Sequence, residues 1–526
     1  MEITNPYSIR LGVAGAGVMG SGIALTALQQ GMNVTLYDVA EGVLEKARAY
    51  IEKFLTKKNQ GGYLRRLTLT TRLEDLRGAG VVIEAAPEDL DIKKDLFRRL
   101  DALCPPPAVL ATNTSTLAVT AIAAAVSSPE RVAGMHFFNP APVMPLVEVV
   151  RGARSSPETV NTLVSLAEFL GKTPIVVRDL PGFIVNRVAR PFYGEALRLL
   201  GEGAATHEAI DLIIRQGGGF RMGPFQLMDL IGVDVNFAAM QSMYTQTFGE
   251  PRYRPHPIQA QMVQQQALGR KSGRGFYDYT NGAEITDPPP LRPSKAEGQV
   301  IISSGTWAPG LEALCRQSAY SLRTMTGMDL ITVGRPTAAV LAAGRGEGLA
   351  RLAADLDQLL PPEIPLLCQC TDVTLTEVGS WLRHPQRLAG FDGLFAAAGN
   401  VVTLVSLPHT REAVRSQVES FFASLGKRAV WVEDSPALVL PRVVCMLANE
   451  AAFAAGEGVA DMGTIDTAMR LGVNYPRGPL EWAQSLGYAK TAAVLDHLHS
   501  EYREERYRAA PLLRRLARLE SYPPES

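Results

Sequence analysis

One histidine and one glutamate in the sequence stand in a setting that suits proton transfer. His136 lies where a strand pattern passes into a loop, beside Phe137 and Phe138, and Glu148 lies within the apolar strand pattern Leu146–Val150. An apolar strand rarely carries a carboxylate without a partner, because burying an unpaired charge is costly. A glutamate that orients the imidazole would leave it able to act as a base near neutral pH. The pattern therefore predicts a His136–Glu148 pair, and a histidine satisfied within the core is the other interpretation.

A glycine-rich turn near the start of the chain predicts a phosphate-binding site. An apolar run leads into Gly15-Ala-Gly17-Val18-Met19-Gly20, and a helical pattern follows the turn. In a nucleotide-binding βαβ unit, Gly15 would permit the tight turn, Gly17 would let the backbone approach a pyrophosphate, and Gly20 would let the helix pack on the strand. The unpaired N–H groups of the helix N-terminus would then face the phosphates, with Val18 and Met19 beside the cofactor.

Asp38 ends the second strand pattern of this unit and favours NAD as the cofactor. Its carboxylate can accept hydrogen bonds from the ribose hydroxyls, and its charge would repel the 2′-phosphate of NADP. A turn or capping aspartate is the other interpretation of this residue. Strand and helix patterns alternate up to about residue 180, so we expect a Rossmann-like α/β sheet with ligands at the carboxyl ends of its strands.

Two further polar residues follow predicted strands and could touch a ligand. Ser115 follows one strand, and Asn186 lies just after Pro181-Gly182, where the chain enters the next helix. Taken alone, Ser115 is typical of an N-cap for a helix at Ala118–Val126, and Asn186 is typical of a polar residue early in a helix. An amide donor at that place could also stabilise an oxygen that gains negative charge.

Four motifs together resemble the L-3-hydroxyacyl-CoA dehydrogenase family over roughly residues 8–280: GAGVMGSGIA, NTST, HFFNPAPVMPLVEVV and PGFIVNRV. The resemblance implies the NAD-dependent oxidation of an (S)-3-hydroxyacyl-CoA to a 3-oxoacyl-CoA. It also implies that His136 is the base, that Glu148 orients it, and that Ser115 and Asn186 complete the catalytic set. One departure is Pro145, where relatives commonly carry lysine; it concerns substrate details rather than activity.

The resemblance implies additional contacts to the cofactor and to CoA. The further cofactor residues would be Glu88, Lys93, Asn139 and Lys271. Ser115 would also contact the CoA substrate, and Lys53, Lys57 and Lys58 are candidates from the residues themselves, because their positive charges could reach the CoA phosphates. The three lysines lie on a basic helical stretch, for which a solvated helix face is an equally good interpretation.

The segment GFIVNRVARP, the tail EERYRAAPLLRRLARLES and the chain length resemble one branch of the family more closely. That branch comprises the 3-hydroxyadipyl-CoA and 3-hydroxybutyryl-CoA dehydrogenases of phenylacetate breakdown. An adipyl tail would require a cation, for which Arg190, Arg221 and Arg254 are candidates. A dehydrogenase of free hydroxy acids and an NAD-binding protein without catalysis remain the two alternative functions.

The second half of the chain looks like a copy of the first. Gly171–Gly232 aligns without gaps on Gly426–Gly487, a constant shift of 255 residues. The candidate catalytic residues are not repeated, since Asn186 falls on Pro441, His136 on Asp392 and Glu148 on Leu404. Trp307 falls on the place of Gly17 and would block a pyrophosphate. We therefore expect only the first copy to be active.

These patterns predict a Rossmann-like domain and an all-α domain, duplicated in tandem with a reduced and degenerate second Rossmann-like domain. The predicted boundaries are 1–187 for the NAD-binding domain, 188–285 for the helical domain, 286–295 for a proline-rich linker, 296–425 for the reduced domain and 426–526 for the second helical domain. In the family, single-copy enzymes dimerise through the helical domain. The duplication thus predicts a pseudo-dimeric chain, which could still form a homodimer.

Composition excludes several classes of partner. The 526 residues carry 52 lysines and arginines against 53 acidic residues, so no excess of positive charge suits nucleic acid or an anionic membrane. No apolar run approaches the ~20 residues of a membrane span, and the start lacks the features of a signal peptide. The five cysteines share no metal-ligand spacing, so no metal is expected. A cytoplasmic location is the resulting expectation.

Overall fold

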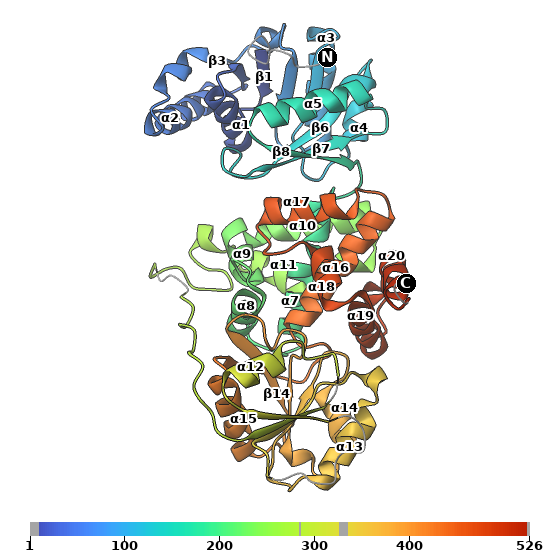
Figure 1. The fold of residues 1–526 in the computed structure, drawn as a ribbon. Helices are drawn as coiled ribbons and strands as arrows, with labels where there is room; N and C mark the ends of the chain where they lie inside the picture. Colours follow the sequence, from blue (N-terminus) through green and yellow to red (C-terminus); the bar gives the residue numbers. More distant parts are fainter. Residues whose placement is uncertain (1–9, 283–285, 304, 326–334, 523–526) are drawn as a thin grey trace. The chain divides into compact units, whose positions relative to one another are not determined.

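The computed structural model describes residues 10–282, 286–303, 305–325 and 335–522 (Figure 1). These residues pack as two compact units. Unit 1 contains residues 10–188 together with 454–474, and unit 2 contains residues 189–453 together with 475–522. Each unit holds one large β-sheet. No helix within the described ranges is long and apolar enough to cross a membrane.

The sheet of unit 1 has the strand order β3-β2-β1-β4-β5-β6-β7-β8. Its strands are β1 (Arg10–Ala14), β2 (Asn33–Tyr37), β3 (Leu67–Thr70), β4 (Val81–Glu84), β5 (Val109–Thr112), β6 (Val132–Phe137), β7 (Leu146–Arg151) and β8 (Thr173–Arg178). All neighbours pair in parallel except β6 and β7, which are antiparallel because a short connection joins them in place of a crossover helix. The predicted Rossmann-like sheet is confirmed.

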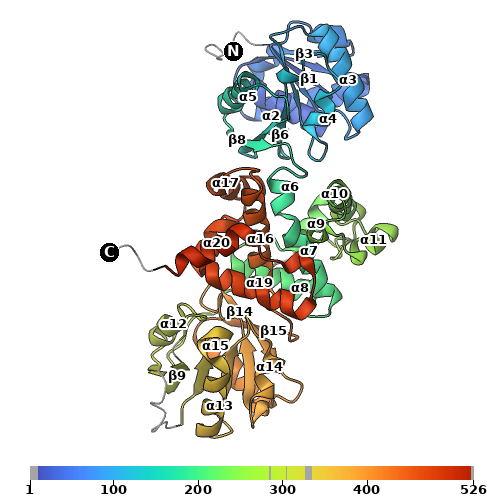
Figure 2. The ribbon, with the colours of Figure 1, turned by 90° about the vertical axis from the view of Figure 1, so that its right-hand side faces the viewer.

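Helices cover both faces of this sheet (Figure 2). On one face, α1 (Val18–Gln29), α2 (Glu41–Lys57) and α5 (Pro157–Phe169) bury their apolar sides against the strands. The opposite face carries α3 (Leu90–Leu103) and α4 (Val119–Ala123). Unit 1 also contains the short helix α6 (Val185–Val188) and, from the second half of the chain, α17 (Met462–Val473).

The helix predicted at Ala118–Val126 is shorter in the structure, and the N-cap interpretation of Ser115 is wrong. The helix α4 is capped by the Asp179 carboxylate, which accepts N–H bonds from Val119 at 3.0 Å and Thr120 at 2.7 Å. A charged acceptor makes a stronger bond to the unpaired N–H groups of a helix than a hydroxyl does. Ser115 is thereby left available for another contact.

Unit 2 contains the helical domain of the first half, most of the second one, and the second sheet. In unit 2, the first helical domain contributes α7 (Arg190–Gly201), α8 (His207–Leu212), α9 (Pro224–Ile231), α10 (Val233–Gln246) and α11 (Pro257–Gln264). The second contributes α16 (Leu440–Gly456, of which the last turn belongs to unit 1), α18 (Pro479–Leu486), α19 (Tyr488–Tyr502) and α20 (Pro511–Glu520). Between them in sequence lies the second sheet.

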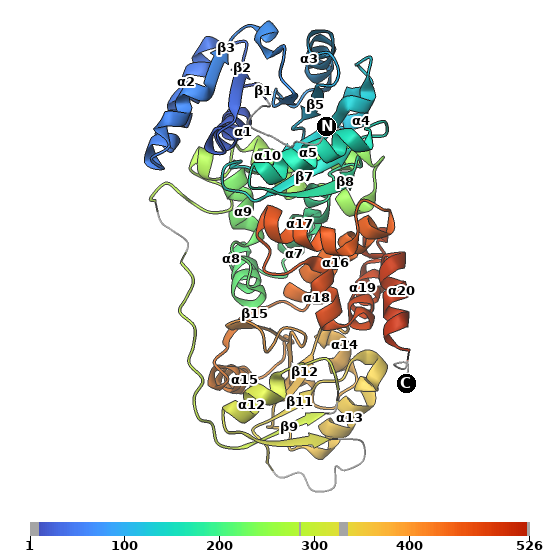
Figure 3. The ribbon, with the colours of Figure 1, turned by 45° about the horizontal axis from the view of Figure 1, so that its top comes forward.

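The strands of the second sheet are β9 (Gln299–Ser303), β10 (Ser321–Met325), β11 (Ala338–Leu341), β12 (Leu366–Gln369), β13 (Leu388–Phe391), β14 (Val401–Ser406) and β15 (Arg428–Val432). Their order, β10-β9-β11-β12-β13-β14-β15, repeats that of the first sheet without a counterpart of β3 among the described residues. One face carries α12 (Leu311–Gln317) and α15 (Glu412–Ser424), and the other carries α13 (Leu349–Leu359) and α14 (Leu375–Ser380) (Figure 3). The predicted duplication with a reduced second Rossmann-like domain is confirmed.

Strand pairing corrects one expected equivalence between the two copies. Glu148 lies opposite Ile175 of β8, and the residue opposite Val430 at the same place in the second sheet is Thr403. Thr403 therefore replaces Leu404 as the counterpart of Glu148. The stretch between β13 and β14 is one residue shorter than its counterpart, and a gap-free alignment cannot place that loss. Either way, the second copy has no carboxylate at this position.

A buried cluster of charges joins the two helical copies within unit 2. The Glu195 carboxylate, which is fully buried, accepts from Arg442 Nε at 2.9 Å and from Arg506 at 2.8 Å. Burial alone would raise the pKa of Glu195, but the charges of Arg506 and Arg442 hold it at about 2. Glu195 comes from the first copy, whereas both arginines come from the second.

The same contact occurs a second time with the roles of the copies exchanged. Glu450, which lies 255 residues after Glu195, accepts from Arg252 at 2.8 Å and from Tyr253 at 2.6 Å. Here the carboxylate belongs to the second copy and its donors belong to the first. Contacts that are repeated in exchanged form are the mark of an isologous, two-fold interface.

Candidate active site

The histidine and the glutamate predicted as a pair lie together in the sheet of unit 1. The antiparallel register of β6 and β7 sets His136 opposite Glu148, and Nδ1 of the imidazole lies 2.7 Å from the buried carboxylate. The other carboxylate oxygen accepts N–H bonds from Ile184 at 3.0 Å and Val185 at 3.1 Å. Because an ionised carboxylate can only accept, Nδ1 donates, and Nε2 keeps a lone pair that can take a proton.

Ser115 and Asn186 complete the predicted set around the imidazole. The Ser115 hydroxyl lies 3.0 Å from Nε2 of His136, and the Asn186 side-chain amide donates to the Ser115 carbonyl oxygen at 3.3 Å. Two aromatic rings flank the imidazole, with ring centres at 4.6 Å for Phe138 and 5.9 Å for Phe183. The structure therefore brings together all four residues proposed to be catalytic, with the Ser115 hydroxyl beside Nε2 of His136.

A strained turn before α6 supplies the two N–H groups that hold Glu148. Gly182 has φ +75° and Phe183 has φ +49°, so two consecutive residues adopt the left-handed conformation. This conformation is costly for phenylalanine and is maintained only by surrounding contacts. The turn aims the N–H groups of Ile184 and Val185 at the carboxylate. Sequence reasoning missed the role of Phe183, although the preceding Pro181-Gly182 signals a turn.

Glu88 holds the loop that carries Ser115. One oxygen of its carboxylate accepts from the Thr114 hydroxyl at 2.6 Å, from Ser115 N at 2.9 Å and from Thr116 through both its N–H and its hydroxyl. Burial would raise the pKa of Glu88, but the Thr114 hydrogen bond and the charge of Lys93 hold it below its usual range. Glu88 is thus an ionised acceptor built into the Ser115 loop, and a contact with the cofactor stays a prediction.

Lys93 is a buried cation shared between two carboxylates. Its ammonium lies 2.6 Å from Glu84 and 3.4 Å from Glu88. Glu84, which sequence reasoning missed, also accepts from the Thr112 hydroxyl at 2.7 Å and thus ties the ends of β4 and β5 together. A glutamate at the end of an apolar strand pattern was the available signal, the same one that identified Glu148.

The glycine-rich turn is tightly packed at two glycines and open to a ligand at the third. A Cβ on Gly15 would lie 2.5 Å from the Ala85 carbonyl oxygen, and one on Gly20 would overlap the Gly15 carbonyl oxygen. A Cβ on Gly17, by contrast, would meet no atom within 4 Å, so the backbone there is open to a ligand. The α1 N-terminus that follows has no side-chain cap, and the exposed Val18 begins the helix. These residues fit a bound pyrophosphate.

Asp38 organises the same turn. Its carboxylate accepts from Ala16 N at 2.8 Å and from Ala40 N at 3.0 Å, which is the turn interpretation of this residue and is compatible with a cofactor contact. Each carboxylate oxygen can accept a further bond, which leaves capacity for ribose hydroxyls. In a bound NAD, Asp38 would hold the adenosine ribose.

The remaining predicted contacts are exposed residues, a half-buried methionine of the turn and one lysine of unit 2. Asn139 is exposed just after the His136 strand, and Met19 is half-buried in the turn. Lys271 belongs to unit 2, where it forms an ion pair with Asp234 at 2.6 Å. The exposed lysines at the end of α2 are Lys53, Lys57 and Lys58. Their contacts with cofactor and CoA stay predictions.

The corresponding turn of the second sheet is filled by the protein itself. Trp307 is buried and packs so closely on Gly344 that a Cβ there would overlap its indole. The Glu347 carboxylate accepts from the Thr306 hydroxyl at 2.8 Å and from Gly344 N at 3.2 Å. The same carboxylate also accepts from Thr306 N at 3.4 Å, an N–H of the turn that would face phosphates in an active Rossmann-like domain. The predicted block by Trp307 agrees with this geometry.

Asp392, the counterpart of His136, gives a pH-dependent prediction. Burial raises the pKa of Asp392 to about 7, although Phe395 N donates to it at 3.1 Å. Since the folded protein prefers the protonated form, ionisation costs stability from about pH 4 upward and reaches its full cost above about pH 7. We expect Asp392→Asn to stabilise the protein at pH 8 by on the order of 1–4 kcal/mol, and not at pH 4. Melting temperatures of both proteins at the two pH values check this, and an equal shift at both would refute it.

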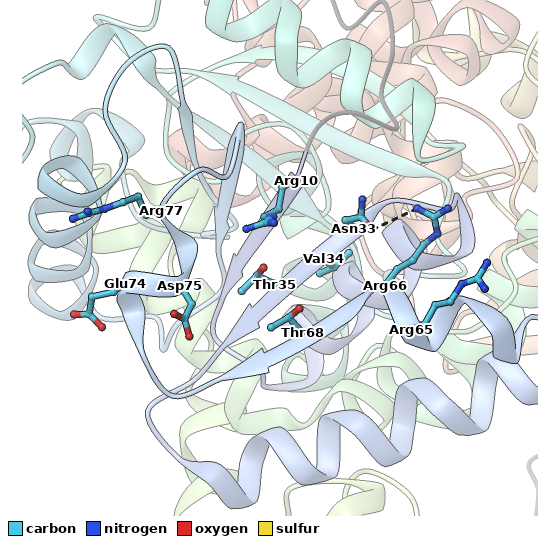
Figure 4. A pocket seen from close by; sticks show the side chains of 10 residues that line it. All are labelled: Arg10, Asn33, Val34, Thr35, Arg65, Arg66, Thr68, Glu74, Asp75 and Arg77. Atoms are coloured by element: carbon cyan, nitrogen blue, oxygen red, sulfur yellow. Dashed lines mark hydrogen bonds between the residues drawn. The ribbon is translucent and has the colours of Figure 1, made fainter.

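A hollow of about 470 Å³ in unit 1 lies away from this site (Figure 4). Arg10 and Asn33 line it, and these residues begin β1 and β2, whereas the glycine-rich turn and Asp38 follow the opposite ends of the same strands. Arginines and acidic residues both line the hollow. It is therefore separate from the nucleotide turn and from His136.

Comparisons with known proteins agree with the geometry. A family model described as 3-hydroxyacyl-CoA dehydrogenase, NAD binding domain, matches residues 10–180. The model of the 3-hydroxyacyl-CoA dehydrogenase C-terminal domain matches twice, at 182–279 and 438–525. The second match covers the duplicated helical domain.

Two relatives and one solved structure illustrate the similarity. The 3-hydroxyadipyl-CoA dehydrogenase of Escherichia coli (strain K12) is 38% identical over 97% of both chains. The 3-hydroxybutyryl-CoA dehydrogenase of Clostridioides difficile is 43% identical, over 52% of this chain and 99% of its own. The crystal structure of 3-hydroxybutyryl-CoA dehydrogenase from Escherichia coli has a TM-score of 0.80 at 37% identity, covering 98% of this chain and 99% of that one.

Proposed function

This chain belongs to the 3-hydroxyacyl-CoA dehydrogenase family, and from that premise we propose how its residues oxidise an (S)-3-hydroxyacyl-CoA to the 3-oxoacyl-CoA. The observation that carries the proposal is the imidazole of His136, held at Nδ1 by Glu148 with Nε2 beside the Ser115 hydroxyl. NAD, when bound, supplies the acceptor for the hydride that leaves C3 of the substrate.

Side chains of the protein accept the proton of the C3 hydroxyl and bind the C3 oxygen. Nε2 of His136 takes the proton of the C3 hydroxyl as the carbonyl forms, and Glu148 stabilises the resulting imidazolium. The Ser115 hydroxyl and the Asn186 amide donate to the C3 oxygen and orient it. In the reverse direction the same imidazolium returns its proton to the oxygen of the 3-oxoacyl-CoA.

Two acyl groups are the leading substrates, those of 3-hydroxyadipyl-CoA and 3-hydroxybutyryl-CoA. They are named in the two full-length matches from Escherichia coli. The adipyl tail ends in a carboxylate, so an enzyme that prefers it would require a cation at the end of its acyl site. We propose 3-hydroxyadipyl-CoA as the preferred substrate, because the relative of that name matches 97% of both chains.

A spectroscopic assay tests the activity, and a ratio tests the acyl group. With NADH and acetoacetyl-CoA we expect loss of the NADH absorbance, and none with free acetoacetate. Oxidation of NADH with free acetoacetate, but not with acetoacetyl-CoA, would favour a free hydroxy acid as substrate. Binding of NADH without its oxidation by either compound would favour a non-catalytic protein. A kcat/KM that is higher for 3-hydroxyadipyl-CoA than for 3-hydroxybutyryl-CoA supports the adipyl assignment, and the reverse order would contradict it.

The assembly and location of the chain remain predictions. The exchanged contacts of Glu195 and Glu450 support the proposal that one chain forms a pseudo-dimer by itself. Sedimentation of the purified protein tests whether a homodimer also forms. A cytoplasmic location follows the expectation from composition and is tested by cell fractionation.

A further inference from the structure

One segment of the second half packs inside unit 1, although that half has lost the catalytic residues. Residues 454–474, which include α17, belong to unit 1, while the rest of the second half belongs to unit 2. The segment contacts β7, β8 and α6. These elements carry Glu148 and Asn186, so the contacts of the segment bear on the chemistry of the first half.

Gly472 in α17 makes the closest approach. A Cβ at this buried glycine would lie 2.8 Å from Leu146 Cδ2 and 2.9 Å from Val185 Cγ2. Leu146 stands two residues before Glu148 on the same face of β7, and the Val185 N–H donates to the Glu148 carboxylate. The helix therefore packs directly on both residues that flank the carboxylate holding His136.

Glu457 binds the residue next to Asn186. Its carboxylate lies 2.8 Å from the buried Arg187 guanidinium, and its carbonyl oxygen accepts from the Arg178 side chain at 3.0 Å. Two residues further on, the Val459 carbonyl oxygen accepts the Arg178 N–H at 3.1 Å. The segment thus covers the end of the edge strand β8 and anchors the short helix α6.

The same contacts occur in unit 2 with the copies exchanged, and the glycine contact there is looser. There Arg442 pairs with Glu202 at 2.9 Å, and both residues lie 255 positions from Arg187 and Glu457. A Cβ on Gly217, the counterpart of Gly472, would lie 3.3 Å from Leu440. Of the two glycine contacts, the tighter one is beside the catalytic residues.

We propose that residues 454–474 are a positioning element for the active site, with Gly472 and Glu457 fixing the backbone that presents Val185 to Glu148 and Asn186 to Ser115. The inference rests on the proposed function, since it assigns an effect on the same dyad. The second half of the chain, which lacks the catalytic residues, thereby contributes to turnover, because its helix α17 keeps Glu148 in the position that orients His136. Neither Gly472 nor Glu457 touches the reacting atoms.

Two variants and two matched controls test the positioning role. Gly472→Ala adds the crowding methyl group, and Gly463→Ala makes the same change in the first turn of the same helix, where a Cβ would meet only Asp461 at 3.4 Å. Glu457→Gln weakens the pair with Arg187, and Glu505→Gln alters an exposed pair with Arg508. Each protein is compared for kcat, NADH affinity, the pH profile of kcat and amide hydrogen exchange of residues 183–189.

We expect Gly472→Ala to lower kcat by about tenfold and Glu457→Gln by about threefold, because small misplacements of catalytic groups reduce the rate strongly. NADH affinity should stay within about twofold of wild type, the pH profile should shift, and exchange at residues 183–189 should accelerate. Both controls should behave as wild type. Wild-type kcat and exchange in Gly472→Ala and Glu457→Gln, with only a lower melting temperature, would overturn the proposal. An inactive wild type would refute the proposed function instead, and the exchange comparison would still decide the positioning role.

Discussion

His136→Asn is expected to lower kcat for 3-hydroxyacyl-CoA oxidation by about 10²–10⁴-fold, the usual contribution of a positioned general base. The asparagine amide occupies the place of Nδ1 and can still donate to Glu148, so the buried carboxylate keeps its partner. Only the proton acceptor at Nε2 is lost. Steady-state kinetics with 3-hydroxybutyryl-CoA and NAD measure the effect, and NADH affinity should not change.

Asp392→Asn is the matched control, because it makes the corresponding change in the second copy. We expect it to leave kcat unchanged, since Trp307 and Glu347 fill the turn that a second cofactor would need. Substantial turnover by His136→Asn would show that another base operates. Loss of turnover in Asp392→Asn would show that the second copy takes part in the chemistry.

Glu195→Gln is expected to cost about 3–5 kcal/mol of unfolding free energy at pH 7, because it leaves two buried arginines without their shared carboxylate. Both Arg442 and Arg506 are almost fully buried, and the contact links the two helical copies. The loss should therefore appear in unit 2, as a lower midpoint of urea unfolding. Glu504→Gln is the control, since Glu504 binds Arg198 in a partly exposed pair worth less than about 1 kcal/mol.

The pH dependence gives a second criterion for Glu195. Its pKa is about 2 in the folded protein and near the ordinary value of 4.5 when unfolded, so the stability it contributes is complete above about pH 4.5. That contribution is lost as the pH falls from about 4.5 towards 2. The difference between wild type and Glu195→Gln should therefore shrink below about pH 4.5. A difference that is small at pH 7 would contradict the role of Glu195 as the link between the copies.

Much of the active site was predictable because its signals are local. The spacing of Gly15, Gly17 and Gly20 is typical of a tight turn that binds phosphate. Glu148 lies within an apolar strand, where burying its carboxylate without a partner would be costly. The antiparallel register then places that partner at His136. The residues alone left a core histidine as a second interpretation of His136, and the family resemblance was needed to choose the pair and to add Ser115 and Asn186.

Other features depended on contacts between distant segments. The cap of α4 comes from Asp179, some sixty residues away, and a charged acceptor there displaces the expected role of Ser115. Thr403, and not Leu404, is the counterpart of Glu148, because the stretch between β13 and β14 is one residue shorter than in the first sheet. Only the strand pairing reveals this difference. The segment 454–474 could not be assigned to unit 1 from its helical pattern. Such a pattern indicates which face of the helix is buried, but not which part of the protein packs against that face.

The central claim is that one half of the chain performs the chemistry and the other half holds structure. Calorimetric titration of the full-length protein with NADH tests it most directly. The account predicts one binding site per chain, and no detectable binding to a Gly17→Trp variant, which copies into the first turn the residue that fills the second. Two sites per wild-type chain, or one site that survives in Gly17→Trp, would contradict it.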